Sequence, residues 1–305
     1  MLPTLRPIRP GDADALGALW NRSVPYDDLS AALLHEKIWG DPDFAPRRAL
    51  VAEAAGALAG FGMGVRWGAP NETRGTIKLL CVAPEHRRRG LGGALLAALE
   101  QALVAEGART LRIAESSPNY LAPGLDVRHT PGWLFVQKHG YARVGEAFNM
   151  TVDLAAEAWS TAEAEAALAA RGLAVRRAAS EDRLAVMALL EAHWPAWKPE
   201  IGRTFTNVPI SLHLGARAET PGRILGFAAY DANNIGTAWF GPMGTDPGER
   251  GLGLGGVLCR RCLRDLAAQG HVRATIPWVA PVGFYAHHAG AHVSRVFHRF
   301  EKAVP

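Results

Sequence analysis

Two short segments place arginine just before closely spaced glycines, a combination suited to binding phosphate. The first cradle is Arg87-Arg88-Arg89-Gly90-Leu91-Gly92-Gly93, and the second cradle, which begins 163 residues later, is Arg250-Gly251-Leu252-Gly253-Leu254-Gly255-Gly256. Glycine lets main-chain N–H groups approach an anion without a side chain in the way, and arginine supplies a fork of donors. An apolar, helix-like stretch follows each cradle, and a helix N-terminus attracts negative charge. The repeat predicts two copies of one anion-binding fold.

Other glycine-rich motifs fit these segments less well. The second cradle also satisfies Gly-x-Gly-x-x-Gly, but a dinucleotide site would need an acidic residue about 20 positions later, where the chain reads Ala274-Thr275-Ile276-Pro277-Trp278. The first cradle fails that motif because Leu95 stands three residues after Gly92. The chain has no Gly-Lys-Ser/Thr element, so a P-loop NTPase is not indicated. Glycines that only make tight turns are the alternative for either copy alone, and the repetition favours the phosphate role.

The elements around the cradles repeat as well. Each half begins with a strand and a helix start, at residues 5–12 and 173–180. A strand precedes each cradle (76–82 and 237–244), a helix that ends at a glycine follows it (94–107 and 257–270), and then another strand (110–114 and 272–276). In the second half Gly241-Pro242 interrupts the strand, and because proline removes a ladder donor, we expect an edge or a bulge there.

The segment between the halves is rich in alanine and glutamate, which favours helix over a flexible linker. We therefore predict an N-terminal domain over residues 1–154, a helical connector over 155–172 and a C-terminal domain over 173–305.

The bulk composition is that of a soluble globular protein. The 305 residues suit two domains, and the formal charge of +4 is too small for a dedicated nucleic-acid binder. No apolar run is long enough for a membrane span, and the N-terminal residues lack a signal-peptide pattern. Three cysteines make no disulfide framework, so we expect a cytoplasmic protein with no membrane partner.

At this point the chain resembles the GCN5-related N-acetyltransferase (GNAT) superfamily in its tandem form. The segments Val82–Gly92 and Asp246–Gly255 look like that family's Gln/Arg-x-x-Gly-x-Gly/Ala motif for acetyl-CoA. The family's Phe-Tyr-Glu-Lys-Leu-Gly-Phe-like segment has weaker counterparts at Phe135–Tyr141 and Phe284–Ala291. The resemblance covers nearly the whole chain. It implies an α/β (mixed α+β sheet) fold with two tandem acyl-CoA N-acyltransferase domains.

The resemblance also implies the chemistry. Acetyl-CoA is the expected cosubstrate, and an amine of an unidentified small molecule or peptide attacks its thioester directly. In this reading the pantetheine lies where the strand before each cradle splays from its neighbour. The expected cofactor-binding residues are Cys81, Val82, Arg87, Arg88, Arg89, Gly90, Leu91, Gly92, Gly93, Gly244, Thr245, Arg250, Gly251, Leu252, Gly253, Leu254, Gly255 and Gly256.

The halves differ at the position where the family has a tyrosine that acts as general acid. Tyr285 stands there in the second half, whereas the first half has Val136, which cannot donate a proton. We therefore expect Tyr285 to be catalytic and the second half to carry the reaction. The general base is undetermined: Glu115 and Asp126 are candidates in the first half, and water can also carry the amine proton away. In the second half, Asp231 and Trp278 are candidates to line the acceptor site.

Other reactive-looking residues have simpler explanations. Cys259 and Cys262 have metal or redox spacing, but they fall within the helix after the second cradle, so we expect them to pack inward. Histidines gather near the end of the chain without a complete ligand set, and no metal is expected. Trp194 and Trp197 are candidates for an acceptor wall or for the core.

Three classes of function remain at this point. The leading one is the N-acetyltransferase, the second is a CoA-binding sensor or scaffold without turnover, and the third is a flavin or nicotinamide oxidoreductase. The expected oligomeric state is a monomer with an internal pseudo-dimer, or a homodimer.

Overall fold

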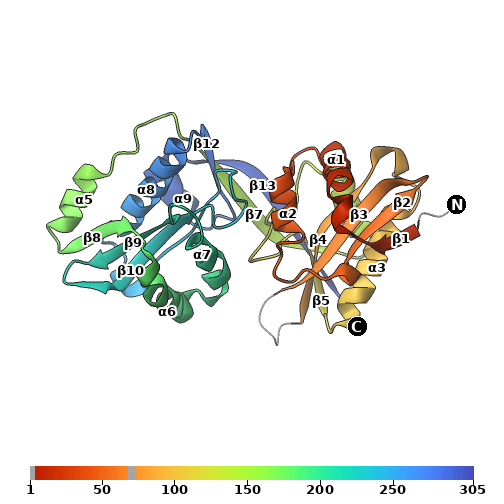
Figure 1. Cartoon of the computed structure of the whole chain (residues 1–305), viewed down its shortest axis with the longest axis horizontal. Helices are drawn as coiled ribbons and strands as arrows, with labels where there is room; N and C mark the ends of the chain where they lie inside the picture. Colours follow the sequence, from red (N-terminus) through yellow and green to blue (C-terminus); the bar gives the residue numbers. More distant parts are fainter. Residues whose placement is uncertain (1–3, 68–72) are drawn as a thin grey trace. The chain divides into compact units, whose positions relative to one another are not determined.

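The computed structural model describes residues 4–67 and 73–305. The chain forms two compact units, the first made of residues 1–147 with 296–305 and the second of residues 148–295 (Figure 1). Both are mixed α/β structures, as predicted. Within the described ranges no helix is both long and apolar enough to cross a membrane.

The first unit is a sheet covered by helices on both faces (Figure 1). Its strand order is β1-β2-β3-β4-β5, followed by the end of β13, and the β4–β5 pair is parallel. Helices α1 and α2 pack on one face, and α3 and α4 on the other. The elements are β1 (Thr4–Pro7), α1 (Ala13–Ser23), α2 (Ala31–Lys37), β2 (Ala49–Ala54), β3 (Ala57–Trp67), β4 (Arg74–Val82), α3 (Leu91–Ala105), β5 (Thr110–Ile113), β6 (Leu125–Asp126), α4 (Thr130–Lys138) and β7 (Ala142–Asp153).

The second unit repeats this plan. Its sheet runs β11-β10-β9-β8, and β12 pairs with the end of β7. Helix α8 packs on one face with α9, and α6 and α7 pack on the other. The elements are α5 (Ala162–Ala169), β8 (Leu173–Arg177), α6 (Arg183–His193), α7 (Lys198–Thr204), β9 (Leu212–Arg217), β10 (Thr220–Tyr230), β11 (Phe240–Thr245), α8 (Leu254–Ala268), β12 (Arg273–Ile276), α9 (Val282–Ala289) and β13 (His292–Ala303).

The unit boundaries differ from the predicted domains 1–154 and 173–305. Residues 148–154 and the connector 155–172, including α5, fall in the second unit, whereas residues 296–305 fall in the first. The reason is strand pairing: Arg273–Ile276 of β12 pairs with Met150–Asp153 of β7, and Glu301–Ala303 of β13 pairs with Thr110–Arg112 of β5. Each unit therefore takes its last strand from the other half of the sequence.

The helices after the cradles begin earlier than predicted. α3 starts at Leu91 and α8 at Leu254, so two glycines of each cradle belong to the first helical turn instead of the loop. A short 3-10 turn precedes each cradle, at Pro84–His86 and Pro247–Glu249. The predicted bulge at Gly241-Pro242 is confirmed, because the β10–β11 register shifts between Ala228 and Tyr230.

Candidate functional site

The two cradles share one backbone conformation. Arg88 and Gly90 have φ of +62° and +83° in the first cradle, and Gly251 and Gly253 have φ of +79° and +90° in the second. Successive turns of this kind aim several N–H groups into one concavity that suits an anion. Gly90 and Gly253 also cap their helices, whose first N–H groups have no partner within the helix. Both loops therefore have the backbone conformation that the phosphate-binding prediction requires.

The glycines inside the helices have a packing role. A β-carbon on Gly92 would lie 3.4 Å from the Phe135 ring, and one on Gly93 would lie 3.2 Å from His139. In the second unit the corresponding contacts are Gly255 with the Phe284 ring (3.3 Å) and Gly256 with the His288 ring (2.7 Å). These glycines let α4 and α9 approach the start of the cradle helix, which fixes the position of its N–H groups.

The cradle arginines are not equivalent. Arg87 donates to the carbonyl oxygens of Val82 (3.1 Å) and Ser23 (2.8 Å), so it holds the cradle against β4 and α1. Arg88 and Arg89 are exposed, and they are better placed to meet a ligand. The second cradle has only Arg250, which is also exposed.

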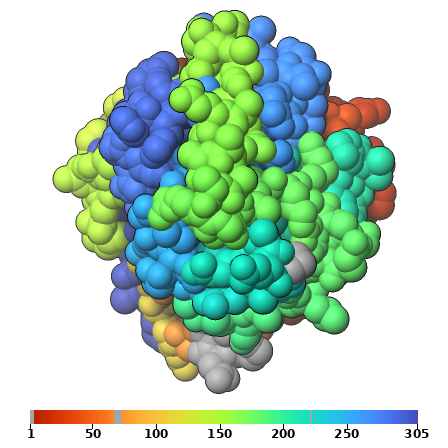
Figure 2. All heavy atoms as spheres, turned by 90° about the vertical axis from the view of Figure 1, so that its left-hand side faces the viewer, coloured from red at the N-terminus to blue at the C-terminus, as the bar shows by residue number. Residues whose placement is uncertain are grey.

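Sequence reasoning missed one further arginine at the second cradle. Arg171, just after α5, donates from Nη1 to the carbonyl of Leu252 at 3.0 Å. Leu168 of α5 is buried in the same cluster as Leu254, and Glu165 forms an ion pair with Arg261 of α8 at 2.8 Å. Figure 2 shows the connector in light green, lying over the blue segments of this unit. The charged residues of the connector could have indicated this contact, but sequence reasoning used the connector's composition only to predict a helix.

The strands next to the cradles separate where the family resemblance implied. The parallel β4–β5 ladder ends at Ile77 and Ile113, while β4 continues to Val82. In the second unit only the bridge between Trp239 and Thr275 joins the corresponding strands. Cys81 with Val82, and Gly244 with Thr245, follow these points in their strands.

The environments of these strand residues differ. Cys81 is buried, which raises the pKa of its thiol to about 12, so it is an inert packing residue. A β-carbon on Gly244 would lie 2.9 Å from the ring of Trp194. Trp194 in turn stacks on Trp197 at 5.6 Å between ring centroids. This pair covers β11 near Gly244, and both rings pack against the core of this unit.

Each splayed strand carries a bulge, and the bulged residues differ. In β4, Met63 pairs with Leu79 and Gly64 with Ile77, so Lys78 is the extra residue. The position 163 residues later is Gly241, with φ of +105°. Gly241 is buried, and apart from its two chain neighbours no atom of the described residues lies within 4 Å of a β-carbon placed on it. A charged side chain therefore projects from the first bulge, and open space adjoins the second.

Tyr285 lies on α9 and is 8% exposed. Its ring packs edge-on against Phe240 and Phe284, at 5.9 and 5.1 Å between centroids. Burial, together with the nearby thiols of Cys259 and Cys262, raises the pKa of its hydroxyl well above the usual value. The group therefore stays protonated at physiological pH. Val136, its counterpart on α4, is an apolar core residue.

Both candidate general bases are held by arginines. Glu115 is fully buried and accepts from Arg112 at 2.9 Å and from Arg299 at 2.5 Å. Asp126 accepts from Arg128 at 2.7 and 2.9 Å. Both carboxylates therefore take part in ion pairs with neighbouring arginines.

The two residues expected to line the acceptor site lie in loops of the second unit. Asp231 accepts the N–H of Gly236 at 3.1 Å, and the N–H of Trp278 donates to Asn149 at 3.1 Å. Both residues have positive φ. These contacts help to hold the two turns in shape.

Cys259 and Cys262 are free and fully buried on α8, which confirms the prediction that they pack inward. Among residues 4–67 and 73–305, no group of three or more His, Cys, Asp or Glu side chains is arranged to hold a metal ion.

The chain matches the Acetyltransferase (GNAT) family model twice, over residues 14–124 and 183–290. It is 32% identical over 230 residues to a mycothiol acetyltransferase of Kineococcus radiotolerans, covering 72% of this chain and 69% of that protein. It is also 32% identical over 124 residues to an acetyltransferase of Pectobacterium atrosepticum, covering 40% of this chain and 82% of that protein.

Solved structures show the same tandem fold. A GCN5-related glucosamine N-acetyltransferase region of a fungal multi-domain enzyme superimposes with a TM-score of 0.83 at 17% identity, over 98% of this chain and 38% of that one. A tandem GNAT protein from the clavulanic acid biosynthesis pathway gives 0.70 at 16% identity, over 99% of both chains. The two matched segments, the repeated cradles and the splayed strands agree: this chain belongs to the GNAT family and is an acetyltransferase with two GNAT repeats.

Proposed function

We propose that this protein transfers an acetyl group from acetyl-CoA to a primary amine of a small molecule or peptide, and that the second unit carries the reaction. The observation that carries this assignment is the open bulge at Gly241, in the unit that also has Tyr285. The first unit has Lys78 and Val136 at these places.

Both cradles fit the diphosphate of acetyl-CoA. Two left-handed residues in each loop turn main-chain N–H groups toward one concavity, and arginines at the rim supply positive charge. In the second unit the cofactor-binding residues would be Gly244, Thr245 and 250–256. In the first they would be Cys81, Val82 and 87–93. The cosubstrate supplies a thioester that an amine can attack directly.

The protein's own groups then have three tasks. Main-chain N–H groups of the splayed strand stabilise the carbonyl oxygen as it gains charge. The amine nitrogen forms its bond to the acetyl carbon while the carbon–sulfur bond breaks, and the amine releases a proton to water. Tyr285 donates its phenolic proton to the leaving sulfur, and solvent restores that proton. Because its pKa is raised, Tyr285 is protonated before the carbon–sulfur bond breaks.

The test is release of CoA from acetyl-CoA with a panel of amines that includes glucosamine, putrescine and a peptide N-terminus. We expect Tyr285→Phe to lower kcat about 100-fold and to leave the KM for acetyl-CoA nearly unchanged. Tyr141→Phe is the matched control, because Tyr141 is a buried tyrosine of the first unit that bonds Glu100. CoA release that survives Tyr285→Phe at the wild-type rate would remove Tyr285 from the mechanism. An absence of release with every amine would count against the activity itself.

We also propose that the protein acts in the cytoplasm. The three buried, free thiols suit a reducing cytoplasm.

A further inference from the structure

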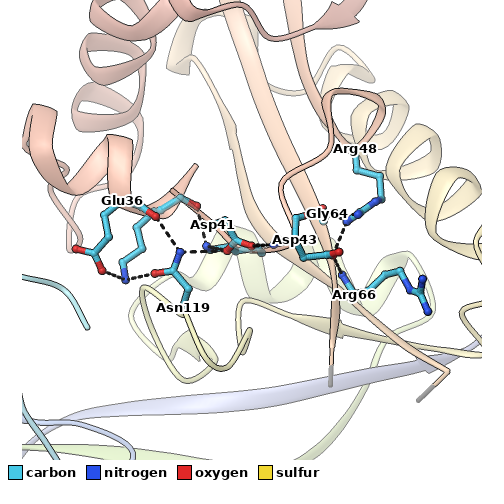
Figure 3. Close-up of polar contacts among 9 residues, drawn as sticks. Glu36, Asp41, Asp43, Arg48, Gly64, Arg66 and Asn119 are labelled. Atoms are coloured by element: carbon cyan, nitrogen blue, oxygen red, sulfur yellow. Dashed lines mark hydrogen bonds and ion pairs between the residues drawn. The ribbon is translucent and has the colours of Figure 1, made fainter. Parts of the chain in front are cut away.

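Five buried polar residues of the first unit form a connected cluster around Lys78, which we call the Lys78 cluster (Figure 3). Lys78 donates from Nζ to the main-chain carbonyl of Lys37 at 2.7 Å and forms an ion pair with Asp41. Lys37 donates to Glu36 and to the side-chain oxygen of Asn119, each at 2.9 Å. Asn119 donates to the Glu36 carbonyl at 2.8 Å and to Asp41 at 3.2 Å.

Burying two lysine side chains carries a desolvation cost, so the position of the cluster in the fold calls for an explanation. Both lysine side chains are fully buried, and a buried ammonium is tolerated only when it is well paired. The members come from α2, from the loop after it, from the β4 bulge and from the loop after β5. They therefore converge on the bulge that follows Ile77, where β5 leaves β4.

Two positions of this cluster carry different residues in the second unit. Gly241 replaces Lys78 and has open space beside it. At the end of α7, where α2 has Lys37, the residue is Thr204, which bonds the carbonyl of Ile201 at 2.7 Å. One bulge is thus filled by an ammonium with its own acceptors, and the other is not.

We propose that the Lys78 cluster occupies the acceptor position of the first unit, with the ammonium of Lys78 standing where an acceptor amine would stand. The first unit then holds acetyl-CoA without passing its acetyl group to an amine, because Lys78 fills the acceptor position in a unit that also has Val136 in place of the acid tyrosine. The inference rests on the proposed function in one respect, namely that both cradles take acetyl-CoA. An incoming amine would have to displace a lysine whose carbonyl and carboxylate partners are already in place.

The proposal can be tested by removing the lysine side chain and supplying it as a separate molecule. Lys78→Gly leaves a hole of the size and chemistry of n-butylamine. All variants are made in the full chain with Tyr285→Phe, so that transfer by the second unit is reduced. Lys78→Met removes the ammonium but keeps the space filled, and is the matched control. Should Lys78→Gly fail to fold because Asp41 loses its partner, Lys78→Gly/Asp41→Asn replaces it.

We expect n-butylamine to raise the melting temperature of the Lys78→Gly chain but not that of Lys78→Met. We also expect its acetylation, followed as CoA release and as N-butylacetamide, to be about tenfold faster in Lys78→Gly than in Lys78→Met, because the amine is then held beside the thioester. Equal rates in the two variants would overturn the proposal. So would acetylation of Lys78 itself when the wild-type chain is incubated with acetyl-CoA.

Binding is measured separately, so that the proposed function can fail on its own. Calorimetry of the wild-type chain should give two molecules of acetyl-CoA per chain, and Gly90→Val should remove one. A wild-type chain that binds both molecules but acetylates no amine contradicts the proposed function alone. A first unit that binds no acetyl-CoA overturns the inference.

Discussion

The two units share the backbone conformation of the cradle and differ in the side chains at the strand bulge and on the helix beyond it. The cradles match in φ at two positions each, and the same glycine contacts recur, with Phe135 and His139 in one unit and Phe284 and His288 in the other. The bulge and the helix beyond it differ, with Lys78 and Val136 against Gly241 and Tyr285. Under the proposed function, the two units would bind acetyl-CoA mainly through the same main-chain groups and would differ in reactivity through a few side chains.

The source of positive charge also differs between the units. The first cradle carries Arg88 and Arg89 within its own loop, whereas the second has Gly251 and Leu252 at those places. Arg171 of the connector bonds Leu252 and brings a guanidinium to the same loop. The connector thus supplies a positive charge to the second cradle, whereas the first cradle carries this charge on its own residues.

The largest expected effect comes from breaking one cradle at a time. Valine at a left-handed position forces the loop out of shape, because a β-branched residue is excluded there. If the second unit carries the reaction, Gly253→Val should lower turnover at least about 100-fold, whereas Gly90→Val should leave most of it. Steady-state CoA release checks this, with circular dichroism and melting curves as controls for folding. A larger loss from Gly90→Val would reverse the assignment of the units.

A smaller effect is expected from the connector. Arg171→Gln should weaken acetyl-CoA binding at the second cradle about fivefold, the size of one charge-assisted contact partly exposed to solvent, with little change in kcat. Arg223→Gln is the control, since Arg223 pairs with Glu249 at the surface, at 3.2 Å. Calorimetry at low and high salt measures both. A loss in kcat with unchanged affinity would contradict the role in binding.

The smallest effect concerns pH. Asp265 fastens α8 to the sheet through His213 at 2.6 Å, whereas Glu100 fastens α3 through Tyr141 and Lys302, without a histidine. Burial lowers the pKa of His213, so the unfolded chain binds this proton more readily than the folded one. The stability of the second unit is then complete above the ordinary histidine pKa and falls as the pH drops through it.

Hydrogen exchange resolved by peptide checks this, since protection of α8 should decrease between neutral pH and pH about 5.5 more than that of α3. His213→Gln should abolish the difference. An equal decrease in both helices would show that another group is responsible.

Local patterns were enough to predict much of this molecule. Glycine spacing and apolar periodicity located both cradles, their helices and the bulge at Gly241, because each depends on neighbouring residues. Contacts between distant segments were not readable in this way. Nothing near Lys78 in the sequence points to Asp41 or Asn119, and the contact of Arg87 with Ser23 depends on how α1 packs. The ion pair of Glu115 with Arg299 was unreadable for the same reason, since Arg299 comes from a strand far along the chain. The partner of Asp126, Arg128, is by contrast only two residues away.

The exchange of final strands has a consequence for synthesis on the ribosome. β5 emerges early, yet its partner in β13 follows only after all residues of the second unit. While the second unit is being translated, the β5 edge of the first unit's sheet has no partner strand. A chain released before β13 would leave β5 paired only with β4, so cleavage or premature termination in the second half should also destabilise this edge of the first unit.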